Sequence, residues 1–421
     1  MSCVLLGGGV RRRAFHRLLS GFVVPGFVVP GFVVPGFVVP GFVVPGFVVP
    51  GMAAPALAMR ALRVSASCLQ AACLLAAWRP SALVRAAMLL GCLATTPALA
   101  DLRILHLDVG MGDATLVVDT GSGQSLLIDA GNRGDGRRVV APALIALGID
   151  RLDYFLASHY DADHIGGFDE LIEAGVTVET VLERPGIKPE VLSPTGRDTQ
   201  YGEYLAAARA VGARLVELIP DCRPDHPQLR LGADTRIQVA AAGGRHLAGD
   251  IGFCEVGEQS LHPRRENARS VALIIEHGRF RYFTGGDLTG GGARSVPMEA
   301  FVAAQVGNVD VLKLNHHGSD TSTSDTFVQT LRPEVAVLSV GDGGVNLRYR
   351  LPRQAPLDRL AKLSPAPLLF QTRQGEGGSY LGAYVENRHI VVHTDGESYT
   401  INGLICVVDE RTQASEGGHC R

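Results

Sequence analysis

The residues His159-Tyr160-Asp161-Ala162-Asp163-His164 decide the fold predicted for this 421-residue chain. They follow an apolar segment, residues 152–158, that predicts a short strand, and they precede Gly166-Gly167. Four side chains that can bind a metal lie within six residues, on a loop that the strand would hold rigid. Imidazole and carboxylate ligands together suit zinc, manganese or iron. The motif therefore predicts a metal site with ligands His159, Asp161, Asp163 and His164; a polar surface loop is the alternative.

Two more polar motifs follow apolar strands later in the chain. Asp287 ends the segment Phe283-Thr284-Gly285-Gly286-Asp287, whose glycines would let the carboxylate turn inward and bridge two metals. Gly-Gly-Asp is also an ordinary turn. The second motif is Lys313-Leu314-Asn315-His316-His317-Gly318-Ser319, in which one histidine would face a metal and the other would face away. Ligands from three strand ends can converge at one edge, so the motifs together predict a centre for one or two divalent ions.

The apolar patterns predict strands alternating with helices. We expect strands at residues 102–108, 113–119, 125–129, 152–158, 177–182, 270–276, 279–284, 309–314, 335–340, 390–393 and 399–406. We expect helices at residues 138–147, 168–174, 201–211, 297–305, 325–331 and 356–363. Two successive halves of this kind indicate an α/β fold with αββα layering. Residues 184–265 are interpreted as an insertion, because Pro and Gly are frequent there, and residues 366–421 as a β-rich C-terminal extension.

The order of these motifs resembles that of the metallo-β-lactamase superfamily. Asp129 in Leu127-Ile128-Asp129-Ala130-Gly131, the His159 to His164 motif, Asp287 and His317 match its successive motifs. Within the superfamily, the chain is most similar to the hydrolase domain of ComEC-type DNA-uptake proteins over most of residues 102–363. The segments that carry this likeness are His106 to Ala114, Ser158 to Gly167, Glu266-Asn267 with Ser270, Lys313, and His316 to Ser319.

The resemblance implies a four-layer αββα sandwich and a hydrolase that uses water activated by one or two zinc or manganese ions. The implied ligands are His159, Asp161, Asp163, His164, Asp287 and His317. Asp163 would orient or deprotonate the water, and Lys313 or His316 would stabilise charge on the leaving oxygen. Asp108, Asp129, Asn267 and Ser319 would support the site. The implied substrate is a phosphodiester, either a small molecule or a nucleic acid.

The chain departs from the related sequences at two positions. Asp161 replaces a histidine that is usual in the superfamily, which makes manganese plausible beside zinc and a β-lactamase less favoured. Leu351, in Tyr349-Arg350-Leu351-Pro352, stands where the ComEC-like group has a histidine. Loss of that ligand would favour an alternative reading, a catalytically weak binding module. Esters, lactones and β-lactams stay open as substrates, whereas a serine hydrolase is disfavoured because no Gly-x-Ser-x-Gly elbow is found.

The first hundred residues differ in composition from the rest. They contain eight Arg but no Lys, Asp or Glu, and GFVVP repeats six times over residues 21–50. Residues 79–100 are typical of a secretory signal peptide, with cleavage after Ala100 and a periplasmic or secreted product. A lipoprotein processed at Cys92 is the less favoured alternative. The repeats are interpreted as translation from too early a start codon, with Met52, Met59 or Met88 as the alternative.

From Asp101 onward, charge and cysteine content bound the function further. Eight of the 39 Lys and Arg lie in the first hundred residues, so 31 remain from Asp101 onward. With 42 Asp and Glu in the same part, its net charge is −11. That charge disfavours nonspecific binding to nucleic acid, although Arg264, Arg265 and Arg269 would form a local basic groove. The four remaining cysteines predict the disulfides Cys222–Cys254 and Cys406–Cys420. No stretch after Ala100 approaches 18 apolar residues, so a membrane channel is not expected.

Overall fold

The computed structural model describes residues 101–408, except 224–225, 250–252, 263–264 and 293–294, together with residues 33–34, 37–38 and 420. The chain divides into two compact units, Met1–Ala98 and Leu99–Arg421. In the first unit, two short strands within the repeats, β1 (Val33–Val34) and β2 (Phe37–Val38), pair in antiparallel fashion. The predicted signal peptide lies outside the described residues, apart from the expected cleavage position before Asp101.

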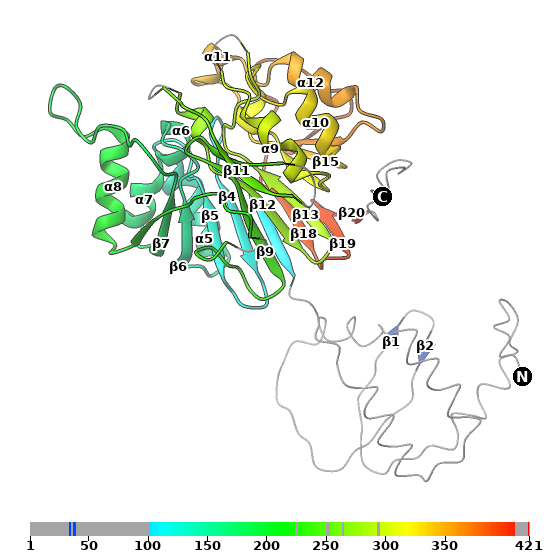
Figure 1. Cartoon of the computed structure of the whole chain (residues 1–421). Helices are drawn as coiled ribbons and strands as arrows, with labels where there is room; N and C mark the ends of the chain where they lie inside the picture. The colour runs from blue at the N-terminus through cyan, green and yellow to red at the C-terminus, as the bar shows by residue number, and fades with distance from the viewer. Residues whose placement is uncertain are drawn as a thin grey trace, which may run out of the picture. The chain divides into compact units, whose positions relative to one another are not determined.

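The second unit contains two nine-stranded mixed sheets (Figure 1). The first sheet has the order β20-β19-β18-β3-β4-β5-β6-β7-β8. Its strands are β3 (Leu102–His106), β4 (Thr115–Asp119), β5 (Ser125–Ile128), β6 (Arg151–Leu156), β7 (Thr177–Glu183), β8 (Arg214–Glu217), β18 (Ile390–Thr394), β19 (Ser398–Ile401) and β20 (Leu404–Val407). The second sheet has the order β11-β10-β9-β12-β13-β14-β15-β16-β17. Its strands are β9 (Thr235–Ala242), β10 (Arg245–Ala248), β11 (Glu255–Glu258), β12 (Ala272–His277), β13 (Phe280–Thr284), β14 (Val311–Lys313), β15 (Val335–Leu338), β16 (Leu368–Gln371) and β17 (Tyr384–Val385).

Helices belong to both halves of the unit. The first half carries the π-helical turn η1 (Gly136–Val140), α5 (Ala141–Ala146), α6 (Ala162–Ile165), α7 (Phe168–Glu173) and α8 (Gln200–Ala210). The second half carries the short turns η2 (Asn267–Arg269) and η3 (Asn315–Gly318), and α9 (Met298–Val306), α10 (Asp325–Leu331), α11 (Asn346–Tyr349) and α12 (Gln354–Ala361). No helix in the described part of the chain is long and apolar enough to span a membrane.

Three hydrophobic clusters establish the layers of this unit. One contains Leu126 and Ile128 of β5 together with Val239 of β9, so it lies between the two sheets. A second contains Leu127 of β5 and the apolar side chains of α5, α7 and α8. The third packs α9, α10 and α12 on the opposite face of the second sheet. Because neighbouring residues of a strand point to opposite faces, β5 supplies two layers at once and is buried throughout. The predicted αββα sandwich is therefore confirmed.

The two segments interpreted as additions are part of the sheets. Residues 184–265 supply β8 to the first sheet and β9, β10 and β11 to the second, with β9 paired directly to β12. Residues 366–421 supply β16 and β17 to the second sheet, and β18 pairs with β3 in the first. Ile237 and Val239 of β9 face the core between the sheets. Both segments therefore complete the two sheets.

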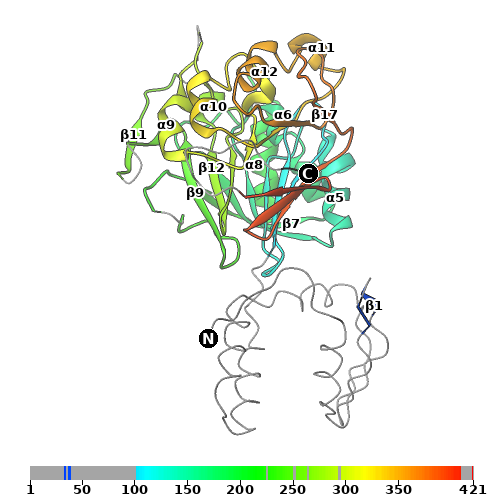
Figure 2. The ribbon, with the colours of Figure 1, turned by 90° about the vertical axis from the view of Figure 1, so that its right-hand side faces the viewer.

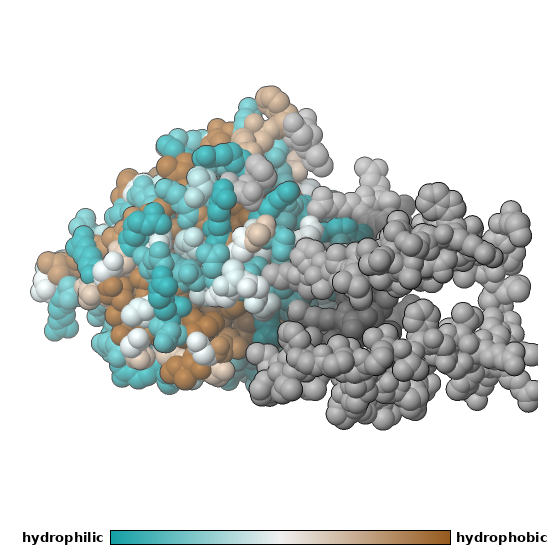
Figure 3. All heavy atoms as spheres, turned by 90° about the horizontal axis from the view of Figure 1, so that it is seen from below, coloured by the Kyte–Doolittle hydropathy of each residue, from teal (hydrophilic) through white to brown (hydrophobic). Residues whose placement is uncertain are grey.

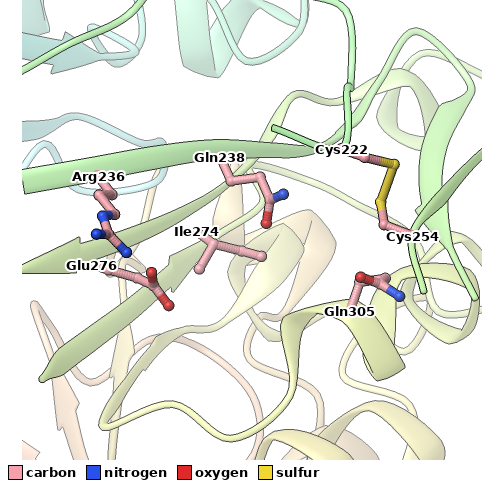
Figure 4. A pocket seen from close by; sticks show the side chains of 7 residues that line it. All are labelled: Cys222, Arg236, Gln238, Cys254, Ile274, Glu276 and Gln305. Atoms are coloured by element: carbon pink, nitrogen blue, oxygen red, sulfur yellow. A yellow bond between two sulfur atoms is a disulfide. The ribbon is translucent and has the colours of Figure 1, made fainter. Parts of the chain in front are cut away.

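Both predicted disulfides, Cys222–Cys254 and Cys406–Cys420, are confirmed. The first borders a cavity of about 280 Å³ on the outer face of the second sheet (Figure 4). The cavity is also lined by Arg236, Gln238, Ile274, Glu276 and Gln305. A turned view shows the helices of the second half at the same end as α6 (Figure 2). A view from below shows hydrophobic residues scattered among hydrophilic ones (Figure 3).

Candidate metal centre

The predicted ligands converge at one edge of the sandwich. β5 and β6 are parallel neighbours in the first sheet, and β13 and β14 are parallel neighbours in the second. Asp129 follows β5, the His159 motif follows β6, Asp287 follows β13 and His317 follows β14. The carboxyl ends of parallel strands meet at one edge, which is where ligands bind in open α/β sheets. Both sheets therefore supply residues to one site.

Three histidines are fixed through Nδ1 and point Nε2 at a common centre. The ring of His164 donates from Nδ1 to Asp129 Oδ2 (2.7 Å), and that of His317 donates from Nδ1 to the carbonyl of Ser339 (3.1 Å). Ser158 Oγ uses its proton on Asp129 Oδ2 (2.6 Å), so it accepts from His159 Nδ1 at 3.1 Å. Each ring thus turns Nε2 to the centre, and histidine binds a metal through that atom when the ring is neutral and its proton is on Nδ1.

Asp287 lies between these nitrogens. Its Oδ1 is 3.2 Å from His164 Nε2 and 3.6 Å from His317 Nε2, and its Oδ2 is 3.8 Å from His159 Nε2. Two ligands bound about 2.0–2.1 Å from one tetrahedral ion are separated by about 3.3 Å. The three Nε2 atoms and Asp287 Oδ1 are buried without any hydrogen-bond partner. Buried polar atoms are rarely left unsatisfied, so four of them around one volume fit a bound cation.

The remaining carboxylates divide the centre into two groups. On the Oδ1 side, Asp163 Oδ2 lies 3.4 Å from His317 Nε2, and Asp163, His164 and His317 together could hold an ion. On the Oδ2 side, Asp161 Oδ2 lies 3.6 Å from His159 Nε2, and His159, His164 and Asp287 form another such group. The side chains of Asp161 and Asp163 are 45% and 26% exposed, whereas the histidines are buried. Each group could hold a divalent ion, and His164 belongs to both groups.

The electrostatics of the centre favour positive charge. Burial opposes ionisation of Asp287, but the imidazoles of His316, His164 and His317 hold the pKa of its carboxyl well below the usual range. Burial likewise opposes protonation of His164, yet Asp287 and Asp129 hold its pKa well above the usual value. The pKa of His317 is raised by Asp287 and Asp163 against the effect of burial. Carboxylates that attract protons onto these rings would attract a divalent cation in the same way.

His316 differs from its predicted orientation. Its Nε2 lies 3.5 Å from Asp287 Oδ2, so both adjacent histidines reach this carboxylate instead of one turning away. Both residues have positive φ angles, 50° and 49°, which allow the two rings to approach from one loop. Asn267 donates from Nδ2 to Asp287 Oδ2 (3.0 Å) and to His316 Nε2 (3.1 Å). Asn267 therefore lies beside the centre.

Lys313 is buried beside the centre and pairs with a buried carboxylate of the other sheet's half. Its side chain is 2% exposed and forms an ion pair with the buried carboxylate of Asp113. The backbone N–H of Asp113 donates to the carbonyl of Asp163 (3.0 Å). Burial raises the pKa of Asp113, but Lys313 more than offsets this, so the carboxylate stays charged. The pair joins the loop after β3 to the end of β14, and hence one sheet to the other.

The other predicted supporting residues act at different distances. Asp129 has φ 61° and binds His164 and Ser158, so it orients the loop after β6. Asp108 pairs instead with Arg373 Nε (2.7 Å). Ser319 Oγ contacts Thr321 Oγ1 (3.1 Å), which in turn contacts His316 Nδ1 (2.8 Å).

Leu351 and Arg269 are both buried. Leu351 is buried in the third hydrophobic cluster and offers no ligand atom from its side chain. Arg269 is buried and donates to the carbonyl of Leu261 (3.0 Å), so it does not line a basic groove. Arg264 lies outside the described residues. The structure therefore gives no support to the groove expected there.

Several residues that hold the site were not predicted as site residues. Glu266 accepts the backbone N–H of Tyr160 (3.0 Å) and pairs with Arg184 through two hydrogen bonds (2.7 and 2.8 Å). Glu299 accepts from Asn315 Nδ2 (2.8 Å) and from two backbone N–H groups at 323 and 324, which fixes the loop that carries the histidines. Gly286 has φ 53°, and a Cβ there would lie 2.6 Å from Ser158 Oγ. A larger residue next to Asp287 would therefore displace the support of His159.

Comparisons with known proteins agree with this geometry. Residues 107–189 match the model of the Metallo-beta-lactamase superfamily. The chain is 29% identical over 275 residues to ComE operon protein 3 of Bacillus subtilis (strain 168), covering 61% of this chain and 30% of that protein. It is 26% identical over 264 residues to Recombination protein 2 of Haemophilus influenzae, covering 62% of this chain and 26% of that protein. A solved diphosphatase of the PhnP family aligns with a TM-score of 0.31 and 12% identity, covering 66% of this chain and 96% of that one. The chain thus spans less than a third of the length of these two curated relatives.

Proposed function

We propose that this protein is an exported metal-dependent phosphodiesterase. The chain carries a metallo-beta-lactamase superfamily hydrolase domain and is distantly homologous to competence proteins. The observation that carries the proposal is the set of four unsatisfied buried atoms around Asp287, three of which are imidazole nitrogens. The mixed nitrogen and oxygen donors suit zinc and manganese. A divalent ion held there would make water a nucleophile near neutral pH and would polarise a phosphodiester.

The residues of the chain have distinct roles in this proposal. His164, His317 and Asp163 would hold one ion, and His159, Asp161 and Asp287 would hold a neighbouring one. His316, whose Nε2 lies 3.5 Å from Asp287 Oδ2, would stabilise charge on the leaving oxygen. Asp163 is partly exposed and its Oδ2 lies 3.4 Å from His317 Nε2, so it orients the attacking water and accepts its proton.

The first test measures metal content and turnover together. We expect about two manganese or zinc ions per chain by elemental analysis and hydrolysis of bis-p-nitrophenyl phosphate by the loaded protein. Asp163→Asn should lower turnover by about 10²-fold or more, because general-base catalysis contributes about that much. Asp234→Asn is the matched control, since Asp234 is exposed beside the start of β9, at the other end of the sheet. Equal turnover in both variants would refute the role of Asp163.

A binding module without catalysis is the second candidate, favoured by Leu351 at a position where related sequences have histidine. It predicts less than one metal per chain and no turnover with either metal. Hydrolysis of lactone or β-lactam substrates in preference to phosphodiesters would instead support a different hydrolase. These outcomes are distinguished by the same loaded protein.

Export is the other part of the proposal. It rests on the signal-peptide pattern of residues 79–100 and on the two disulfides, which persist in oxidising compartments. N-terminal sequencing of the protein recovered from periplasm or medium should begin at Asp101. Recovery of the uncleaved chain in the cytoplasm with reduced cysteines would contradict export.

A further inference from the structure

One exposed loop next to the metal centre has no role in the site described above. This rim loop, residues 341–351, connects the end of the β15 strand region to α12 and contains α11. It is anchored close to His317, because Arg353 N–H donates to the carbonyl of Gly318 (2.8 Å) and Ser339 accepts from His317. Figures 1 and 2 place α11 at the same end of the sandwich as α6, which carries Asp163 and His164.

The rim loop is closed by one buried side chain. Asn346 is fully buried, and its Nδ2 donates to the carbonyls of Gly341 (2.7 Å) and Leu351 (2.8 Å). Its Oδ1 accepts the N–H of Leu351 (2.7 Å). Three hydrogen bonds from one amide therefore hold the two ends of the loop together, so the residues between them project outward on a defined support.

The projecting side chains are basic and apolar. Leu347 is 64% exposed and Tyr349 is 50% exposed, and Arg348 and Arg350 on either side of Tyr349 are exposed as well. No ion pair joins either arginine to an acidic side chain among the described residues. The nearby carboxylates of Asp342 and Glu376 accept backbone N–H groups, at Gly375 (2.7 Å) and Gly343 (2.6 Å). The loop thus offers two arginines that have no acidic partner among the described residues, and a half-exposed aromatic ring. Arg348 Cζ lies 5.8 Å from the centroid of that ring, so a base would stack on it beside the guanidinium.

We infer that the rim loop binds single-stranded nucleic acid and presents it to the metal centre, with Arg348 and Arg350 on phosphates and Tyr349 stacked on a base. The inference rests on the proposed phosphodiesterase activity. Arginine matches the geometry of phosphate, and stacking on an aromatic ring requires a base that is not held in a duplex. A net charge of −11 over the chain from Asp101 does not prevent this, because binding depends on the charge facing the strand.

The experiment separates binding from hydrolysis. Asp163→Asn protein loaded with manganese is titrated into a fluorescent single-stranded oligonucleotide, and anisotropy gives the Kd. In this background we compare three variants. The paired rim variant combines Arg348→Gln and Arg350→Gln, the second variant is Tyr349→Ala, and the control combines Arg230→Gln and Arg236→Gln. The control removes two exposed arginines from the region where β9 begins, away from the centre, so the change in net charge is the same.

We expect the paired rim variant and Tyr349→Ala each to weaken binding about tenfold or more, and the control to change it less than twofold. The slope of log K against log salt should fall by roughly 1.4 in the paired rim variant, since each phosphate contact to a single strand contributes about 0.7. The Kd for a duplex of the same sequence should be the same for Tyr349→Ala and for the parent protein.

Hydrolysis of bis-p-nitrophenyl phosphate by the same rim variants, with Asp163 intact, should equal that of the parent protein. If the rim variants bind the oligonucleotide as well as the control does, or if the parent protein does not bind it at all, the rim loop inference is wrong while the phosphodiesterase proposal stands. If the parent protein binds the oligonucleotide but never hydrolyses bis-p-nitrophenyl phosphate or the strand, the phosphodiesterase proposal fails instead. Equal loss for duplex would exclude stacking on an unpaired base.

Discussion

Replacing Lys313 with Met should destabilise the protein severely, although it removes no contact with the substrate. Lys313 and Asp113 are both nearly inaccessible, with side chains 2% and 3% exposed, and they pair with each other. Removing one partner of a buried ion pair leaves an uncompensated charge and costs about 3–5 kcal/mol. His317 and His164 also favour the charged form of Asp113, which partly offsets the loss. We therefore expect about 3 kcal/mol for Lys313→Met.

The measurement is guanidinium denaturation of metal-free protein, with Asp113→Asn and the double variant completing a cycle. Because the double variant has no buried charge at this pair, it should be more stable than the sum of the single effects predicts, by about 2 kcal/mol. If Lys313→Met costs less than about 1 kcal/mol, or if the two single effects simply add, the assignment of a buried pair is wrong.

A second measurement distinguishes the buried pair from the role that sequence suggested for Lys313. A lysine that contacts the leaving oxygen would, when replaced, lower turnover at unchanged stability. The buried pair predicts instead that the substitution lowers the free energy of unfolding. Turnover should then fall only in proportion to the fraction of protein that is folded and loaded with metal. Turnover is measured with metal in excess, at a temperature where the variant is folded by circular dichroism.

Three further predictions concern the same region. The pKa of His106 is lowered to about 3, first by burial and then by Lys313. Below pH 6.5 the unfolded chain therefore binds a proton that the folded chain does not, and the free energy of unfolding should fall by about 3 kcal/mol from pH 6.5 to pH 4. His106→Gln should flatten this slope in urea titrations. Asp129→Asn should weaken metal affinity about 10–100-fold in a competition titration with a chromophoric chelator, because His164 loses its carboxylate partner. Its control is Asp153→Asn, whose carboxylate also accepts a serine N–H (2.9 Å) but contacts no histidine, and a similar loss there would contradict the assignment. Removing metal with EDTA should lower Tm, since an ion at a thousand times its Kd adds about 4 kcal/mol; an unchanged Tm would mean that the folded protein holds no ion.

Much of the fold could be predicted from local patterns. The apolar strands that precede Asp129, His159, Asp287 and His317 are strong signals, because each is bounded by glycine and polar residues. The disulfides followed from proximity in sequence. β9 was missed because it lies among prolines and glycines, and its partner β12 is separated from it in sequence by two other strands of the same sheet. Pairing over that separation leaves no local pattern.

The site was less predictable than the fold, because sequence places a residue at a strand end without fixing where its side chain lies. His316 and His317 are adjacent in the loop after β14, and a left-handed backbone at both brings both to Asp287. Lys313 is a charged residue on a strand end, and its burial depends on Asp113, which lies far away in sequence. The sequence His106 to Ala114 contained Asp113, but nothing local identified its partner.

The division of the donors between the two sheets has a consequence for how the protein acquires its ion. His159, Asp163 and His164 follow a strand of one sheet, and Asp287 and His317 follow strands of the other, so neither half alone offers a complete coordination sphere. An unfolded or half-folded chain cannot select a metal, and loading waits for the docking of the two halves. A chain exported before it folds would therefore bind the ion that is abundant in the compartment where it folds. The availability of zinc and manganese there would determine which of the two is bound.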